Sequence, residues 1–99
     1  MLWKVKLHRL VLEEDFKRID KTQQLKIIRA IKSKLSKAPN KYGRQLSGQL
    51  SKYRRLRVED YRVIYEVLKD KVKVHVIKIG IRRDFEVYRE IIRRLKKMS

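Results

Sequence analysis

The sequence has 99 residues, which suits one small domain over 1–99, because two domains of half that size could not each bury a core. Its 29 basic and 11 acidic side chains give a net charge of +18, so we expect a polyanionic or strongly acidic partner. Cysteine is absent, which excludes disulfides and thiolate chemistry, and no apolar run is long enough to span a membrane. With no secretory signal visible, we expect a cytoplasmic protein without membrane contact.

Alternating apolar and polar residues predict a first strand over 2–7. Its apolar side chains share one face and are Trp3, Val5 and Leu7. An amphipathic helix of about three turns follows, with the apolar stripe Leu12, Phe16 and Ile19. A second helix over about 21–37 begins after Asp20, a candidate N-cap, and ends before Pro39. The two helices should form a helical hairpin.

Residues 38–52 contain proline, asparagine and glycine and predict an ordered loop. The following stretch alternates with a period of two, which predicts a half-buried strand whose apolar side chains are Leu56 and Val58. Arg55 and Arg57 should then stand together on the opposite face. Glu59 and Asp60 form a turn, and 61–68 predicts the second strand of an antiparallel hairpin.

The C-terminal third predicts one more strand and a closing helix. The strand over 72–79 is apolar on both faces, which is typical of a central strand, and Gly80 ends it. On one face we expect Val72, Val74 and Val76, and on the other His75, Ile77 and Ile79. The apolar stripe of the closing helix is Phe85, Tyr88, Ile92 and Leu95.

The order β-α-α-β-β-β-α predicts a small α+β domain. We expect a twisted, mainly antiparallel four-stranded sheet, with the N-terminal helical hairpin on one face and the C-terminal helix closing the chain. The spacing leaves open where the first strand pairs. The face away from the hairpin should be a concave basic surface, lined in part by Arg55, Arg57 and Arg62.

These arginines allow two interpretations. A charge run is most often a solvated face, and that interpretation stays open. Against it, Arg62 interrupts an apolar strand, where arginine is rare without an anionic partner. Arg82 follows the last strand and would approach Arg62 if the last two strands are antiparallel neighbours, and Tyr88 could point back toward them. Planar guanidiniums suit phosphate oxygens, so the cluster predicts a phosphate site.

Five short motifs stand out in the second half of the chain: Leu-Ser-Gly at 46–48, Tyr-Arg-Arg-Leu-Arg-Val at 53–58, Asp-Tyr-Arg-Val-Ile-Tyr at 60–65, Ile-Gly-x-Arg at 79–82 and Val-Tyr at 87–88. In these motifs the sequence resembles the RelE/ParE toxin superfamily. The resemblance covers essentially the whole chain, including the element order. These motifs are more specific for the superfamily than for a branch within it.

Resemblance to the RelE branch implies a ribosome-dependent endoribonuclease that cleaves messenger RNA in the ribosomal A site and inhibits translation, without metal or cofactor. The catalytic residues that it implies are Arg55, Arg57, Arg62, Arg82 and Tyr88. Further candidates for RNA contact are Arg44, Lys52, Arg54 and Arg83, of which Arg54 and Arg83 should face solvent. Some relatives have lysine at the positions of Arg55 and Arg57. Because arginine cannot accept a proton near neutral pH, both are better assigned as electrostatic groups.

The resemblance also implies the partners. A cognate antitoxin with an acidic, amphipathic segment should hold the toxin inactive by covering the arginine rim or displacing the last helix. The toxin should be monomeric when free and heteromeric with its antitoxin. It should contact the ribosome, with its messenger and ribosomal RNA, and DNA only through the antitoxin.

Other functions stay open. Resemblance to the ParE branch would instead imply a non-enzymatic poison of DNA gyrase, and a plain basic nucleic-acid-binding module is a third hypothesis. By spacing alone, Tyr88 belongs to the apolar stripe and is a core residue. His8 and His75 could form an acid–base pair, but the sequence does not give their separation. No carboxylate cluster predicts a metal site.

Overall fold

The computed structural model describes residues 2–81 and 86–98, except for the side chains of Glu86 and Val87. Its sheet has five strands, which are β1 Lys4–Leu7, β2 Arg44–Gln45, β3 Tyr53–Val58, β4 Tyr61–Leu68 and β5 Lys73–Ile81. The strand order is β1-β5-β4-β3-β2, and only β1 pairs in parallel, with β5. The long helices are α1 Lys21–Ala30 and α2 Glu86–Met98. Shorter helical turns are Val11–Asp15, Phe16–Arg18, Ile31–Leu35, Gly48–Leu50 and Lys69–Lys71.

The predicted α+β class is confirmed, but the sheet has five strands and not the predicted four. The strand β2 lies inside the predicted loop over 38–52, and two residues are too few to show a period. The pairing of β1, which spacing left open, is parallel to β5, with Lys6 opposite His75. Two helices of the model are long, and no helix in its described part is both long and apolar enough to cross a bilayer.

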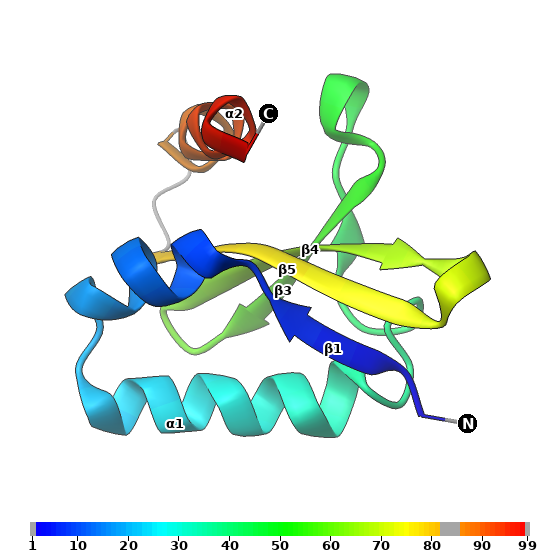
Figure 1. Ribbon diagram of the computed structural model, residues 1–99, viewed down its shortest axis with the longest axis horizontal. Coiled ribbons are helices and arrows are strands. Elements are labelled where there is room, and N and C mark those ends of the chain that lie inside the picture. The colour runs from blue at the N-terminus through cyan, green and yellow to red at the C-terminus, as the bar shows by residue number, and fades with distance from the viewer. Residues whose placement is uncertain (1, 82–85, 99) are drawn as a thin grey trace.

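Helix α1 covers one face of the sheet and α2 crosses the other (Figure 1). The helical turns at 11–18 lie along the edge of β5, so the predicted hairpin covers the face through its second helix and not through both. Asp20 caps α1 as predicted, because its carboxylate accepts the backbone N–H of Gln23 at 2.9 Å. The core under α1 is apolar and joins the hairpin to every long strand. Its fully buried members include Ile27, Leu35, Val63, Tyr65, Val74 and Val76.

A β-bulge in β5 corrects the predicted faces of that strand. Ile64 pairs with Lys78 and Tyr65 with Val76, so Ile77 is the extra residue. The period of two breaks there, and Ile79 joins the core under α1 rather than sharing a face with Ile77. The predicted start at Val72 is also wrong, because Val72 has a φ of 51° and precedes the strand.

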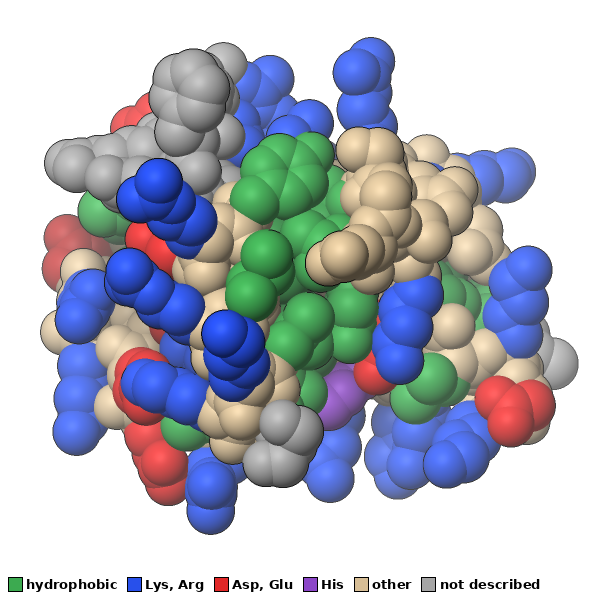
Figure 2. Space-filling view, turned by 90° about the horizontal axis from the view of Figure 1, so that it is seen from above, with side chains coloured by type: hydrophobic (Ala, Val, Ile, Leu, Met, Phe, Trp, Pro, Cys, Tyr) green, Lys and Arg blue, Asp and Glu red, His purple; other side chains and the backbone are tan. Residues whose placement is uncertain are grey.

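The second core lies under α2. Ile91 packs with Ile64 and Ile77 of the sheet, with Tyr53 at the start of β3, and with Leu46 and Leu50 of the segment that precedes β3. Tyr88 and Ile92, on the same helix, stay about two-fifths exposed, at 39% and 41%. The helix therefore keeps an apolar flank at the surface. Figure 2 shows this as a band of hydrophobic side chains bordered by basic ones.

A buried ion pair fastens α2 to the free edge of β5. Arg94 donates two hydrogen bonds to the carboxylate of Asp15, at 2.7 and 3.0 Å, and one to the carbonyl oxygen of Ile77 at 2.9 Å. The backbone N–H of Ile79 also donates to Asp15, at 2.9 Å. Because β1 ends at Leu7, these side chains satisfy the edge groups of β5 beyond it.

Candidate functional site

Three arginines share the sheet face that α2 crosses. Leu56 and Val63 point into the core under α1, so their neighbours Arg55, Arg57 and Arg62 point to the opposite face. Arg57 lies directly opposite Arg62 in the ladder between β3 and β4. The alternation in the sequence therefore brought these three residues together as predicted.

The positive charge of this face is concentrated and partly buried. Arg62 is only 5% exposed, Arg55 is partly buried and Arg57 is exposed. Burial lowers the pKa of Arg55, and the nearby charge of Arg62 lowers it further, as do those of Arg57 and Arg44. Among the described residues, no acidic group lies within ion-pair distance of Arg55 or Arg57. The face is therefore suited to an anion.

Tyr88 approaches this cluster from α2. Its phenol is close enough to Arg55 to act on it electrostatically, in the direction that raises the pKa of that guanidinium. Tyr88 is 39% exposed and belongs to neither buried core cluster, whereas Ile91 supplies the buried contact of the helix. The core assignment that spacing alone gives to Tyr88 is therefore wrong.

Arg82 and Arg83 lie outside the described residues, so the predicted approach of Arg82 to Arg62 stays a prediction. The strand pairing on which it depends is present. Gly80 lies opposite Arg62, and Ile81 opposite Tyr61, so β5 ends beside the start of β4.

The remaining candidates for RNA contact have different environments. Arg44 is exposed and lies directly opposite Arg55, so it extends the same basic face. Lys52 is exposed and forms an ion pair with Glu66 at 3.5 Å. Arg54 does not face solvent as predicted. It lies on the other face of β3, and its guanidinium donates to the carbonyl oxygens of Asn40 and Gly43, both at 3.0 Å. Its role is to hold the loop before β2.

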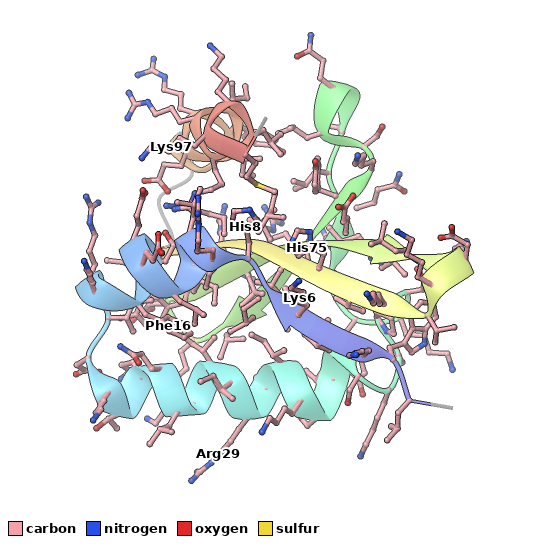
Figure 3. The ribbon with its side chains drawn as sticks, viewed as in Figure 1. Lys6, His8, Phe16, Arg29, His75 and Lys97 are labelled. Carbon is pink, nitrogen blue, oxygen red and sulfur yellow. The ribbon has the colours of Figure 1, made fainter. Side chains whose placement is uncertain are left out.

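The two histidines are close together, which the sequence could not show. Their ring centroids are 5.5 Å apart, because the parallel pairing of β1 with β5 places His8 beside His75. Figure 3 shows both on the side of the sheet that faces α2, and Glu66 lies 3.6 Å from Nδ1 of His75.

Two cavities lie on the other flank of α2, and a third of about 220 Å³ lies at the far end of the sheet, where Lys52, Arg54 and Lys69 line it. One of about 260 Å³ and one of about 170 Å³ share the lining residues Asp15, Arg18, Lys78 and Glu90. The buried ion pair of Asp15 with Arg94 forms part of their wall. Within the described residues, no group of three or more histidine or acidic side chains could hold a metal ion. Carboxylates line both cavities beside α2, so these two lack the purely cationic character of the arginine face.

The comparisons with known proteins agree with this fold. The model of the family described as the ParE toxin of type II toxin-antitoxin systems, parDE, matches residues 5–84. The chain thus belongs to a class of small toxins from type II toxin–antitoxin systems and, within that class, to the ParE toxin family of the RelE/ParE superfamily. No curated protein matches it by sequence.

Several solved structures with a similar fold are RelE toxins or complexes of such a toxin with its antitoxin. The RelBE2 toxin–antitoxin complex of Mycobacterium tuberculosis aligns with a TM-score of 0.77 at 18% identity, over 85% of this chain and 95% of that one. An arginine-to-alanine mutant of Escherichia coli RelE with an antitoxin RelBc peptide gives 0.67 at 25% identity, over 92% and 95%. The archaeal RelE–RelB complex of Pyrococcus horikoshii gives 0.64 at 24% identity, over 85% and 99%.

Proposed function

We propose that this toxin is a ribosome-dependent endoribonuclease that cleaves messenger RNA in the ribosomal A site and so inhibits translation. The observation that carries the proposal is the grouping of Arg55, Arg57 and Arg62 on one sheet face with Tyr88 beside them. Similarity to RelE structures at up to 25% identity supports it.

The chemistry that suits this face is internal attack by the ribose 2′-oxygen on the adjacent phosphorus. The bond from phosphorus to the 5′-oxygen breaks, a 2′,3′-cyclic phosphate forms, and one proton leaves the 2′-hydroxyl while another reaches the leaving oxygen. Negative charge grows on the phosphate oxygens in the transition state, and fixed guanidiniums stabilise it there. Arg62, the most buried of the three, is the proposed clamp on the scissile phosphate, with Arg82 as its helper.

The arginines do not serve as the base, because a guanidinium keeps its proton near neutral pH. Arg55 and Arg57 instead lower the effective pKa of the hydroxyl through their positive charge. Tyr88, partly exposed above Arg55, stacks on a base or orients the hydroxyl. The ribosome supplies the alignment of attacking oxygen and phosphorus, so free RNA should be a poor substrate.

We propose a cognate antitoxin as the second partner. Its acidic segment would neutralise the arginine face, and its apolar side chains would cover the exposed flank of α2 at Tyr88 and Ile92. The solved relatives include complexes with antitoxins. Copurification of the toxin with the product of the neighbouring gene tests this partner.

Primer extension on messenger RNA from cells that briefly express the toxin tests the cleavage. Cuts phased to the reading frame support the proposal, and intact messenger overturns it. Arg57→Gln removes one exposed positive charge from the site. Its matched control is Lys71→Gln, which removes one exposed positive charge away from the site, in the turn between β4 and β5.

The second candidate is a poison of DNA gyrase, which the match to the ParE family favours. It differs in its dependence on the arginine face. A gyrase poison would block supercoiling while messenger stays intact, and Arg62→Ala would keep its toxicity. A supercoiling assay beside the primer extension separates the two candidates.

A further inference from the structure

The histidine cluster lies on the same sheet face as the arginines, at the other end of α2. His75 of β5 lies opposite Lys6 of β1 and opposite Glu66 of β4, so the three side chains share a face. His8, just beyond β1, adds a second ring at 5.5 Å, tilted by 47°. Neither histidine belongs to an apolar core cluster. Figure 2 shows a histidine at the surface, at one end of the hydrophobic band.

Hydrogen bonding fixes the direction in which His8 can donate. Its Nδ1 accepts the backbone N–H of Leu10 at 3.0 Å, so the neutral ring carries its proton on Nε2. The Nδ1 of His75 is directed at Glu66, 3.6 Å away, which leaves its Nε2 for another partner. The hydrogen bond at Nδ1 thus leaves Nε2 as the donor of His8, while His75 has Glu66 beside its own Nδ1.

The surroundings of the two rings are mostly cationic. Lys6 on β1 is exposed opposite His75, and Lys52 before β3 pairs with the same carboxylate, Glu66. Burial lowers the pKa of His8, and the positive groups around it lower it further, namely His75, Arg94 from α2, Arg9 and Lys6. Glu66 is the acidic group that the structure pairs with this cluster among its described residues. A second anion would therefore be stabilised here.

We propose that His8, His75 and Lys6 form a second phosphate-binding site, which takes a backbone phosphate of RNA. The Nε2–H of His8 and the ammonium of Lys6 would donate to the phosphate oxygens, and Glu66 would orient His75 toward them. That the phosphate comes from RNA rests on the proposed function, whereas the site itself rests only on this geometry.

The two sites are a short stretch of nucleic acid apart. Arg62 and Glu66 are four residues apart on β4, so the sites are separated by about 13 Å along the strand. A stacked single strand rises about 3.4 Å per nucleotide, so about four nucleotides span that distance. The apolar flank of α2, with Tyr88 at the arginine end, lies between the sites and offers a surface on which bases stack.

The test uses the fact that the chain has two histidines, so their imidazole NMR signals are resolved and easily assigned. Dimethyl phosphate is the first probe, because it is a phosphodiester whose charge does not change with pH. We expect it to shift the signals of both rings in the whole, untagged chain and to raise the pKa of His8, because an anion stabilises the imidazolium. No shift at saturating probe, or shifts that the variants leave unchanged, would overturn the site.

Two variants and a control sharpen the test. In His8→Asn, the amide oxygen can still accept the N–H of Leu10 while Nε2 is lost, and in Lys6→Gln, only the charge is lost. We expect each to weaken binding of the probe about tenfold, as the loss of a charge-assisted hydrogen bond does. Lys21→Gln, on exposed α1 across the sheet, should bind as the parent does. Equal weakening by Lys21→Gln would mean general charge attraction and would overturn the site.

RNA and DNA pentanucleotides then identify the source of the phosphate. RNA binding that shifts the histidine signals and is weakened by His8→Asn supports the RNA assignment. Equal shifts with DNA overturn the RNA assignment, and the cluster is then a site for phosphodiesters in general. An acidic peptide that shifts the signals when RNA does not would make the cluster a protein contact. This binding is measured without ribosomes, so the two proposals fail separately. Messenger RNA that stays intact in cells would overturn the proposed nuclease function but would leave the phosphate site untouched.

Discussion

Arg57 of β3 and Arg62 of β4 lie directly opposite each other, with both guanidiniums on the sheet face under α2. Like charges so placed destabilise a sheet, typically by about 0.2–1 kcal/mol. Arg62 is also almost completely buried, at 5% exposure. Two guanidiniums held opposite each other concentrate positive charge on this face, which suits a surface that binds an anion.

The first prediction is that Arg57→Gln changes stability and activity in opposite directions. Removing one of two opposed charges should raise the free energy of unfolding by about 0.5 kcal/mol. Losing a group that stabilises the transition state should lower messenger cleavage by about 10²–10³-fold. Urea unfolding and cleavage in a translating extract measure the two effects. If the variant keeps full cleavage, Arg57 has no part in the chemistry.

The second prediction concerns the buried pair that fastens α2. The side chains of Asp15 and Arg94 are 2% and 3% exposed, and removing one partner leaves an uncompensated buried charge. Asp15→Asn should therefore lower the free energy of unfolding by about 3–5 kcal/mol. Glu13→Gln is the matched control, because Glu13 pairs with Arg9 at 3.8 Å on the surface and should change stability little. Similar losses in both variants would show that burial does not decide the effect.

The third prediction separates the two glycines with positive φ. Gly43 has a φ of 74°, and a Cβ there would lie 2.5 Å from the Tyr65 hydroxyl oxygen and 2.8 Å from the Arg55 carbonyl oxygen. Gly48 has a φ of 63° but would place its Cβ in open space. Gly48→Ala should cost about 1–2 kcal/mol from backbone strain alone, and Gly43→Ala clearly more. Thermal unfolding of the two variants gives the comparison, and equal losses would rule out crowding at Gly43.

The fourth prediction is a loss of stability at alkaline pH through Tyr65. Its hydroxyl donates to the carbonyl oxygens of Tyr42 and Pro39, at 2.6 and 2.9 Å, and burial raises its pKa above the ordinary 10.0. The unfolded chain then loses the proton first, so this contribution is complete below pH 10 and is lost as the pH rises toward the folded value.

Urea unfolding between pH 8 and 11 measures this effect. In Tyr65→Phe, the free energy of unfolding should fall less between pH 8 and 11 than it does in the parent. At pH 8 it should be lower by about 1 kcal/mol, because a hydrogen bond is lost. Burial also raises the pKa of Tyr53, so some decline should remain. Tyr61→Phe, at the first residue of β4, serves as the control. A Tyr65→Phe protein with the unaltered pH profile would contradict the assignment.

Local patterns predicted much of this fold and part of its site. Alternation placed Leu56 on one face of β3 and Arg55 with Arg57 on the other, because that assignment needs only the pleat of a strand. The N-cap at Asp20 was likewise a local hydrogen bond, visible as a residue type at the start of an apolar period. The predicted faces of β5 were wrong beyond Ile77, because a bulge depends on the partner strand and leaves no mark in the period.

The long-range pairings decided the rest. The sequence by itself determined the charge, the class of fold and the arginines of one hairpin, since each follows from composition or from neighbours a few residues apart. Only the tertiary structure decided that Tyr88 stays at the surface beside Arg55, that Arg54 holds a loop, and that His8 meets His75. The positions of Tyr88 and of the histidines depend on the docking of α2 by Arg94 and on parallel pairing of β1 with β5, contacts between residues more than 60 positions apart whose register no local pattern encodes. The role of Arg54 depends on a loop that folds back over 11 to 14 positions, to Gly43 and Asn40.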